Sequence, residues 1–126
     1  MKSGNIPDNN ITASSAVSQA KNGRLSNAGS WCADTADNSN PYLQIDLKTL
    51  HIICAVSTQG NPQADQWVET YTLQVSTDAA TWTDYEEVGQ VKVSVSSAYS
   101  FRNKISFFYF YYGDVHSFVT VNPLNV

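Results

Sequence analysis

The chain has 126 residues, which is the length of a single domain, and its formal net charge is −4. Only 14% of the residues are charged, well below the roughly one quarter usual in globular domains. The seven Lys and Arg residues are scattered along the chain, so neither a nucleic-acid surface nor a basic patch for anionic lipid is predicted. Ser, Thr, Asn and Gln supply most of the polarity, a composition found in extracellular β-rich modules.

The first 30 residues are polar and rich in turn-forming residues. Pro7 fixes its own φ, which predicts extended chain entering a turn. Asn10 begins the sequon Asn-Ile-Thr, which makes it a candidate for N-glycosylation if the chain is secreted. Residues 13–20 could form a helical turn, but the Ser residues among them compete with the backbone for hydrogen bonds, so a loop is the preferred prediction there. Residues 1–7 lack the apolar core of a signal peptide, and no export signal is predicted in the chain as given.

Residues 42–60 are the stretch around which the rest of the chain is predicted to pack. Leu43, Ile45 and Leu47 alternate with polar residues, the pattern of a strand buried on one face. After a polar break, every residue from 52 to 56 is apolar. That run is short and rich in β-branched residues, which predicts a second strand covered on both faces and ended by the polar residues 57–60.

Two further strands are predicted after this stretch. Residues 67–76 alternate between apolar and polar side chains, residues 77–80 form a turn, and a short strand follows at 82–85. Strands separated by short loops, with no convincing helix, predict an all-β sandwich or barrel.

The tryptophans and cysteines are expected to serve the core. Trp31, Trp67 and Trp82 are predicted to anchor it; stacking of Trp31 on a sugar is the alternative. Cys32 and Cys54 allow a disulfide, but the sequence shows no connectivity, and Cys54 within the apolar run is interpreted as a small buried hydrophobe. No Cys-X-X-Cys spacing indicates zinc.

No catalytic arrangement is visible in the sequence. His51 and His116 have no Ser-His-Asp or Gly-rich phosphate motif around them, so a surface or hydrogen-bonded role is predicted for His51, and His116 lies in the C-terminal segment. Asp34 and Asp37 are interpreted as turn formers, with cation chelation as the alternative. We therefore predict neither an enzyme nor a bound cofactor or metal.

Several short segments, taken in their order and spacing, resemble the factor V/VIII type C domain, also called the discoidin domain. They include Trp-Cys-Ala at residues 31–33, Tyr-Leu-Gln-Ile-Asp-Leu at 42–47 and Thr-Gln-Gly at 58–60. The others are residues 3–8, 11–15, 24–25, 52–56, 67–68, 71–74 and 76–82. The resemblance implies a jelly-roll-like β-sandwich of the galactose-binding-like class. It also implies a non-catalytic module, secreted or in an ectodomain, whose loops at one end bind phospholipid, collagen or glycans.

The resemblance covers residues 1–90. The predicted organisation is therefore a discoidin domain at 1–90, followed by an unmatched tail at 91–126 that either completes the sandwich or is disordered. The uncharged aromatic run at 105–112 is too short to span a membrane. A sandwich incomplete at its C-terminal end leaves open edges, so marginal stability is predicted.

The chain departs from the family pattern in two places. The family's bridged first and last cysteines have no counterpart here. Ala79 stands where relatives usually carry Gly, and a positive φ at that position would cost Ala about 1–2 kcal/mol.

By resemblance, three loops form the binding end, at residues 16–24, 38–42 and 61–66. The candidate ligand-binding residues are Val17, Gln19, Lys21, Asn22, Arg24, Asn40, Asn61, Gln63 and Asp65. Val17 is the large apolar residue of the first loop and the third has none, so membrane insertion is not favoured. Collagen-binding relatives carry Arg just after Thr-Gln-Gly and an acidic residue in the third loop, where this chain has Asn61 and Asp65.

Polar loops suit hydroxyl-rich glycans, which need planar donors and acceptors. We therefore predict an extracellular adhesion module that recognises a glycan or matrix protein. The alternatives are a peripheral phospholipid binder and a non-functional truncated fragment.

Overall fold

The computed structural model describes residues 6–33, 40–53, 55–64, 66–68, 70–87, 90–91, 94–95, 103–108 and 115–125. Two short 3-10 helices, η1 (Asp8–Asn10) and η2 (Val17–Gly23), flank the first strand, β1 (Ile11–Ala13). The long strands are β2 (Leu43–Ile52), β3 (Ala55–Gln59), β4 (Thr70–Ser76), β9 (Asn103–Phe108) and β10 (Val115–Asn125). The short ones are β5 (Thr83–Asp84), β6 (Glu86–Glu87), β7 (Gln90–Val91) and β8 (Ser94–Val95).

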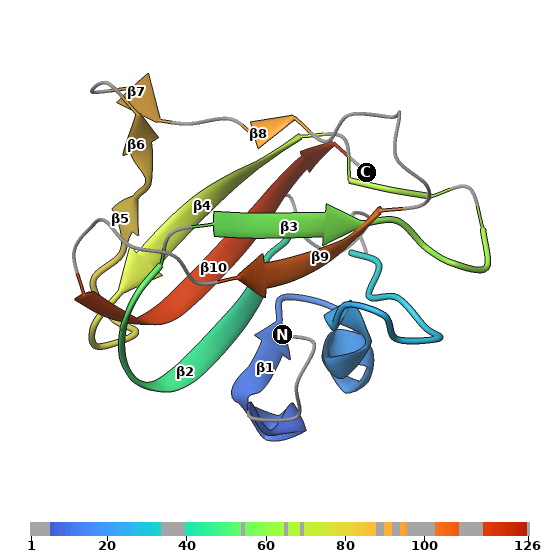
Figure 1. Ribbon diagram of the computed structural model, residues 1–126, viewed down its shortest axis with the longest axis horizontal. Helices are drawn as coiled ribbons and strands as arrows, with labels where there is room; N and C mark the ends of the chain where they lie inside the picture. Colours follow the sequence, from blue (N-terminus) through green and yellow to red (C-terminus); the bar gives the residue numbers. More distant parts are fainter. Residues whose placement is uncertain are drawn as a thin grey trace.

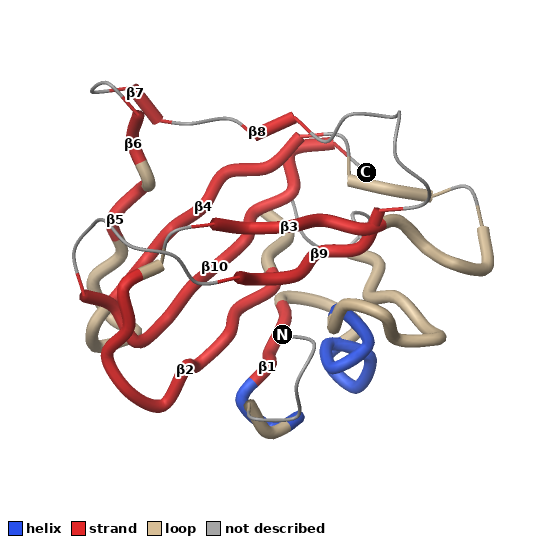
Figure 2. Tube along the Cα trace, viewed as in Figure 1, coloured by secondary structure: helices blue, strands red, loops and turns tan. Residues whose placement is uncertain are grey.

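The strands form two main layers. The larger sheet has the order β1-β2-β10-β4-β5, and β8 also pairs with β4. β3 and β9 form a second, two-stranded sheet that crosses in front of the larger one in Figure 1, and Figure 2 shows the same strands as a tube. β6 and β7 make a separate small ribbon. The arrangement is an antiparallel β-sandwich, as the sequence predicted.

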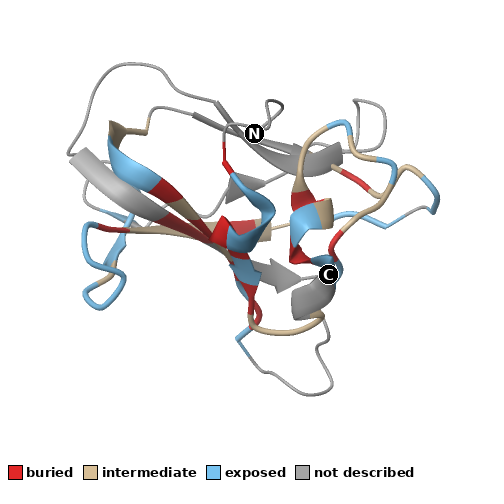
Figure 3. Cartoon of the chain, turned by 90° about the horizontal axis from the view of Figure 1, so that it is seen from below, coloured by how far each residue is buried: buried red, intermediate tan, exposed pale blue. Residues whose placement is uncertain are grey.

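The core lies on the inner face of β2 and the strands beside it. Leu43, Ile45 and Leu47 are buried, which confirms the predicted alternation. Val119 of β10 lies opposite Ile45 and is also buried. Buried residues gather toward the middle of the molecule in Figure 3, whereas the peripheral loops are mainly exposed.

The predicted boundary between the two central strands is wrong. β2 continues through the polar residues to Ile52 because His51 and Ile52 pair with His116 and Val115 of β10. Between these pairs and Asp46, Lys48 takes a positive φ of 70° and its amide donates to Asp46 Oδ1 at 2.7 Å. The register with β10 also shifts between His116 and Phe118, as at a β-bulge. The apolar run 52–56 is therefore no single strand: it ends β2 and begins β3 in the other sheet.

A second correction concerns the segment predicted as a loop at 13–20. The chain takes a left-handed turn at Ala16 (φ 46°) and then forms η2, whose Ala20 is fully buried. η2 ends at Gly23, which lies close to Leu43 of β2. A Cβ at this position would lie only 2.7 Å from Leu43 Cδ2, so the close approach requires Gly. The burial of Ala20 thus favours a helical conformation, which the hydrogen-bonding preferences of the neighbouring Ser residues did not predict.

Residues 91–126 contribute strands to both sheets. In β9, Phe107 lies opposite Val56. β10 lies between β2 and β4, with Val119 opposite Ile45 on one side and Val75 on the other. Val121 is the last residue of β10 that pairs with β2, whereas Pro123 pairs only with Tyr71 of β4. The N–H that Pro123 lacks therefore removes no hydrogen bond between β10 and β2.

The tryptophans have different environments. Trp31 is buried and its Nε1 donates to the Ser15 carbonyl at 3.0 Å, which confirms its core role. Trp82 is half-buried. Trp67 is 42% exposed, so the prediction that it anchors the core is wrong. β4 begins only at Thr70, and the strand alternation therefore does not extend to position 67.

Candidate ligand-binding surface

Two chain segments come together at one end of the sandwich. In Figure 1, η2 with residues 24–33 and the loop 60–68 lie toward the right, where β3 ends. The amide of Ser26 donates to Gln59 Oε1 at 3.2 Å, which joins the first segment to the end of β3. We call this region, residues 16–28, 59–64 and 66–68, the loop end.

The third loop is held in shape by its own polar groups. The Asn61 amide donates to the Gln66 carbonyl at 2.8 Å, and Asn61 Nδ2 donates to Gln66 Oε1 at 3.0 Å. The Gln63 amide donates to Asn61 Oδ1 at 3.0 Å. Gln63 and Gln66 are nevertheless exposed. A loop ordered before a ligand arrives loses less conformational entropy on binding.

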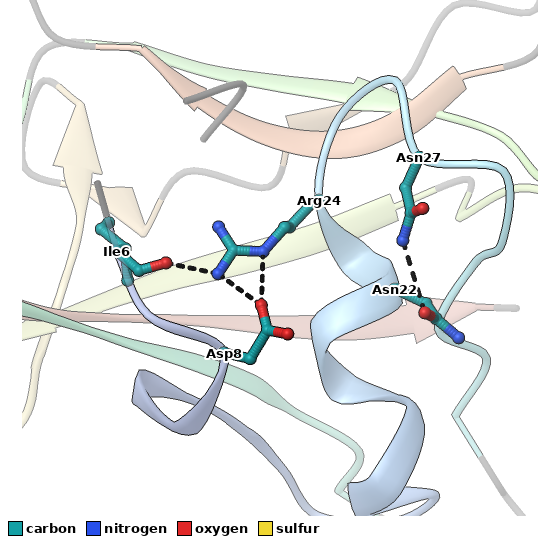
Figure 4. Close-up of polar contacts among 5 residues, drawn as sticks. All are labelled: Ile6, Asp8, Asn22, Arg24 and Asn27. Atoms are coloured by element: carbon teal, nitrogen blue, oxygen red, sulfur yellow. Dashed lines mark hydrogen bonds and ion pairs between the residues drawn. The ribbon is translucent and has the colours of Figure 1, made fainter. Parts of the chain in front are cut away.

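The first loop presents a mixed set of side chains. Gln19 and Lys21 are exposed on η2. Asn22 is half-buried, and its Oδ1 accepts from Asn27 Nδ2 at 3.3 Å (Figure 4). The side chain of Val17 lies outside the described part of the structure. Gln19 and Lys21 are thus the members of this group that face solvent.

Arg24 is occupied within the fold. Its side chain is 16% exposed. Nε and Nη2 donate to Asp8 Oδ1 at 3.1 and 2.8 Å, and Nη2 also donates to the Ile6 carbonyl (Figure 4). The guanidinium therefore ties the N-terminal segment to the end of η2 instead of facing a ligand.

The second loop is described only at its end. Asn40 is exposed, and Tyr42 is fixed to the end of β1 because its amide donates to Ser14 Oγ at 2.9 Å. Ser14 in turn donates its amide to the Tyr42 carbonyl at 3.0 Å. Asp34, Asp37 and Asp65, with Cys54, lie outside the described residues.

The glycosylation candidate is enclosed. Asn10 is only 5% exposed, and its Nδ2 donates to Asp46 Oδ2 at 2.8 Å. Because a glycan would be attached to that nitrogen, the folded domain does not present Asn10 for modification.

Titratable groups are sparse at the loop end. Within the described residues no group of three or more His, Cys, Asp or Glu side chains lies together to hold a metal ion. His51 Nε2 lies 2.9 Å from Thr49 Oγ1, a local contact on β2. Cys32 is a free, exposed thiol.

No helix in the described part is long and apolar enough to cross a membrane.

The one large pKa shift resolved among the described residues belongs to the turn between β4 and β5. The Thr81 and Ala80 amides each donate to Asp78 Oδ1 at 2.8 Å, and Ser76 Oγ donates at 2.9 Å. These hydrogen bonds, the Thr81 amide first, lower the pKa of Asp78 to about 2. This carboxylate orders the turn.

Three residues of this surface were not predicted from the sequence: Ser26, Gln59 and Trp67. In the sequence, Gln59 is only part of the Thr-Gln-Gly string, and its contact with Ser26 joins positions 33 residues apart. No local pattern predicts such a contact. For Trp67 the available signal was its position directly after the polar third loop.

Comparison with known proteins supplies the family. The F5/8 type C domain model matches residues 10–123. Epithelial discoidin domain-containing receptor 1 of Rattus norvegicus is 32% identical over 98 residues, which cover 69% of this chain and 11% of the receptor. Neuropilin-2 of Rattus norvegicus is 33% identical over a region that covers 74% of this chain and 11% of that protein. Lactadherin of Rattus norvegicus is 36% identical over a region that covers 74% of this chain and 25% of that protein. The chain therefore spans only a small part of each relative.

A solved structure agrees with the fold. Recombinant discoidin II of Dictyostelium discoideum has a TM-score of 0.70 at 20% identity, covering 92% of this chain and 49% of that one. Wild-type discoidin II from the same organism has a TM-score of 0.60 at 19% identity with the same coverage. The family match extends into β10, beyond the residues on which the sequence resemblance rested. The chain belongs to the F5/8 type C, or discoidin, domain family and has its galactose-binding-like β-sandwich fold.

Proposed function

We propose that this domain is an extracellular adhesion module that recognises a glycan through its loop end. The observation that supports this most strongly is the set of exposed, neutral amide side chains on ordered backbone, above all Gln63 and Gln66 of the self-bonded third loop. Amides offer donors and acceptors in one plane, which matches adjacent sugar hydroxyls. Membership of a family of non-enzymatic binding modules agrees with this role.

Two other ligand classes fit the surface less well. A phospholipid surface would require several exposed apolar or basic groups, whereas the third loop from Asn61 to Gln66 contains no Lys, Arg or large apolar residue. For a matrix protein such as collagen, the position after Thr-Gln-Gly holds neutral Asn61. An extracellular location is supported by a relative named as a receptor.

The proposal is tested by a glycan array combined with sedimentation on phosphatidylserine vesicles and binding to immobilised collagen. We expect saturable binding to a set of related glycans, and no sedimentation with vesicles. Gln63→Ala should reduce glycan binding about three- to tenfold, the loss of one or two hydrogen bonds. Gln90→Ala, an exposed glutamine on β7 away from the loop end, is the matched control.

Binding to vesicles or collagen without any glycan would overturn the proposal in favour of those ligands. A circular dichroism spectrum without β signal would instead identify a non-functional fragment, because the sandwich is then not formed.

A further inference from the structure

Trp67 is a large indole that faces solvent beside the third loop. It is 42% exposed, whereas Trp31 is buried and Trp82 half-buried. Leaving an indole in water forgoes the free energy that its burial would contribute. An exposed tryptophan next to a candidate binding loop is therefore a candidate contact residue.

Polar, planar amide side chains precede Trp67 in the chain. Gln66, its neighbour in the chain, is exposed and its Oε1 is already fixed by Asn61 Nδ2. The side-chain nitrogen Nε2 of Gln66 remains able to donate to a ligand. Gln63 is exposed on the same loop. The loop end thus combines one exposed aromatic side chain with exposed amide groups one and four positions before it in the chain.

This combination fits the two-sided chemistry of a pyranose ring. One face of such a ring presents C–H groups that pack against an aromatic plane, and its edge carries hydroxyls that pair with amides. We propose that Trp67 is the stacking residue of the glycan site. The ligand is then a pyranose with an exposed apolar ring face. This inference rests on the proposed function and deepens it.

Membrane insertion is the competing use of an exposed tryptophan. It requires further apolar groups at the same depth, and residues 60–66 offer none larger than Pro62 and Ala64. Leu50 and Tyr85 are also exposed, but they belong to β2 and to the β5–β6 connection, away from the third loop. The surroundings of Trp67 therefore favour a sugar.

The test follows the three tryptophan side-chain N–H signals by NMR during titration with methyl β-D-galactopyranoside and methyl β-D-glucopyranoside. Galactitol, an open-chain polyol without a ring face, is the matched ligand control. Trp67→Phe assigns the Trp67 signal by removing it. We expect at least one pyranoside to shift this signal, while the Trp31 signal stays fixed and galactitol has no effect.

Variants then measure the contribution of stacking. Trp67→Ala should lower the affinity for the shifting pyranoside, and for the glycans bound on the array, at least tenfold. Trp67→Phe, which keeps an aromatic ring and guards against loss of the fold, should lower it less than fivefold. Tyr85→Ala removes an equally exposed aromatic away from the third loop and should leave the affinity unchanged.

The outcomes separate this inference from the proposed function. Glycan binding that is unchanged in Trp67→Ala overturns the stacking role and leaves the glycan module standing. Vesicle binding that Trp67→Ala abolishes assigns the indole to membrane insertion and also overturns it. Absence of binding to every pyranoside and every glycan on the array refutes the proposed function, and the stacking role with it.

Discussion

Replacing Ala79 by Gly should stabilise the domain. Ala79 lies in the turn between β4 and β5 with a φ of 60°, in the left-handed region that penalises any side chain with a Cβ. Its side chain is exposed, and its amide donates to Ser76 Oγ at 3.0 Å. Gly preserves that backbone hydrogen bond. The substitution therefore removes strain without removing packing.

The magnitude follows from two opposing terms. Relief of the left-handed conformation is worth about 1–2 kcal/mol, and the extra freedom of Gly in the unfolded chain costs about 0.5–1 kcal/mol. The free energy of unfolding of Ala79→Gly should rise by about 0.5–1 kcal/mol. For a domain of this size the melting temperature should rise by about 2–5 °C.

Chemical and thermal unfolding, followed by circular dichroism, measure both quantities. Ala80→Gly is the matched control, because Ala80 is equally exposed in the same turn but does not have a positive φ. It should lose about 0.5–1 kcal/mol through backbone entropy alone. If the two variants change stability in the same direction and by the same amount, the strain assigned to Ala79 does not exist.

Three further results are expected. Because the folded pKa of Asp78 is lowered to about 2, the stability that its ionised form contributes is present above pH 3.8 and is lost as the pH falls toward 2. Asp78→Asn should therefore remove this step from the pH profile of unfolding. Arg24→Lys should destabilise by about 1–2 kcal/mol, because an ammonium cannot reproduce the paired guanidinium contacts. Gln59→Leu should speed hydrogen exchange of the Ser26 amide and weaken glycan binding about threefold, since it removes the acceptor that joins the two segments.

Each of these has a control and a contradicting result. An unchanged pH profile in Asp78→Asn would show that the turn carboxylate does not stabilise the fold. Lys21→Ala, which removes an exposed cation from η2 just before Arg24, should stay within about 0.5 kcal/mol of the wild type. An equal loss in Lys21→Ala and Arg24→Lys would contradict the role of Arg24. For Gln59, Gln90→Leu is the control, and unchanged Ser26 exchange would show that the loops are not coupled.

The sequence predicted those parts of the fold that depend on local patterns. Leu43, Ile45 and Leu47 show the period of a half-buried strand, and burial follows it. The bulge at Lys48 could not be predicted, because β2 continues there through pairing with β10, more than 60 positions later. Strand boundaries are set by such distant partners as much as by composition.

The candidate site likewise contains residues whose environment the sequence predicted and residues whose environment it did not. Exposure of Gln19, Lys21 and Gln63 is the ordinary behaviour of polar residues on loops, which the sequence conveys well. For Arg24, the structure instead provides a carboxylate 16 positions earlier, and only tertiary contact reveals that partner. The environment of Trp67 depended on where β4 begins, which alternation alone did not fix.

The central claim is that a ligand binds at the loop end of an ordered sandwich. Amide chemical shifts of the labelled domain, recorded with and without the strongest glycan from the array, test it most directly. We predict that the shifts are confined to the loop end and include Ser26, Gln63 and Trp67. Shifts that cluster instead around Leu50 and Tyr85, with the loop end unaffected, would contradict the claim.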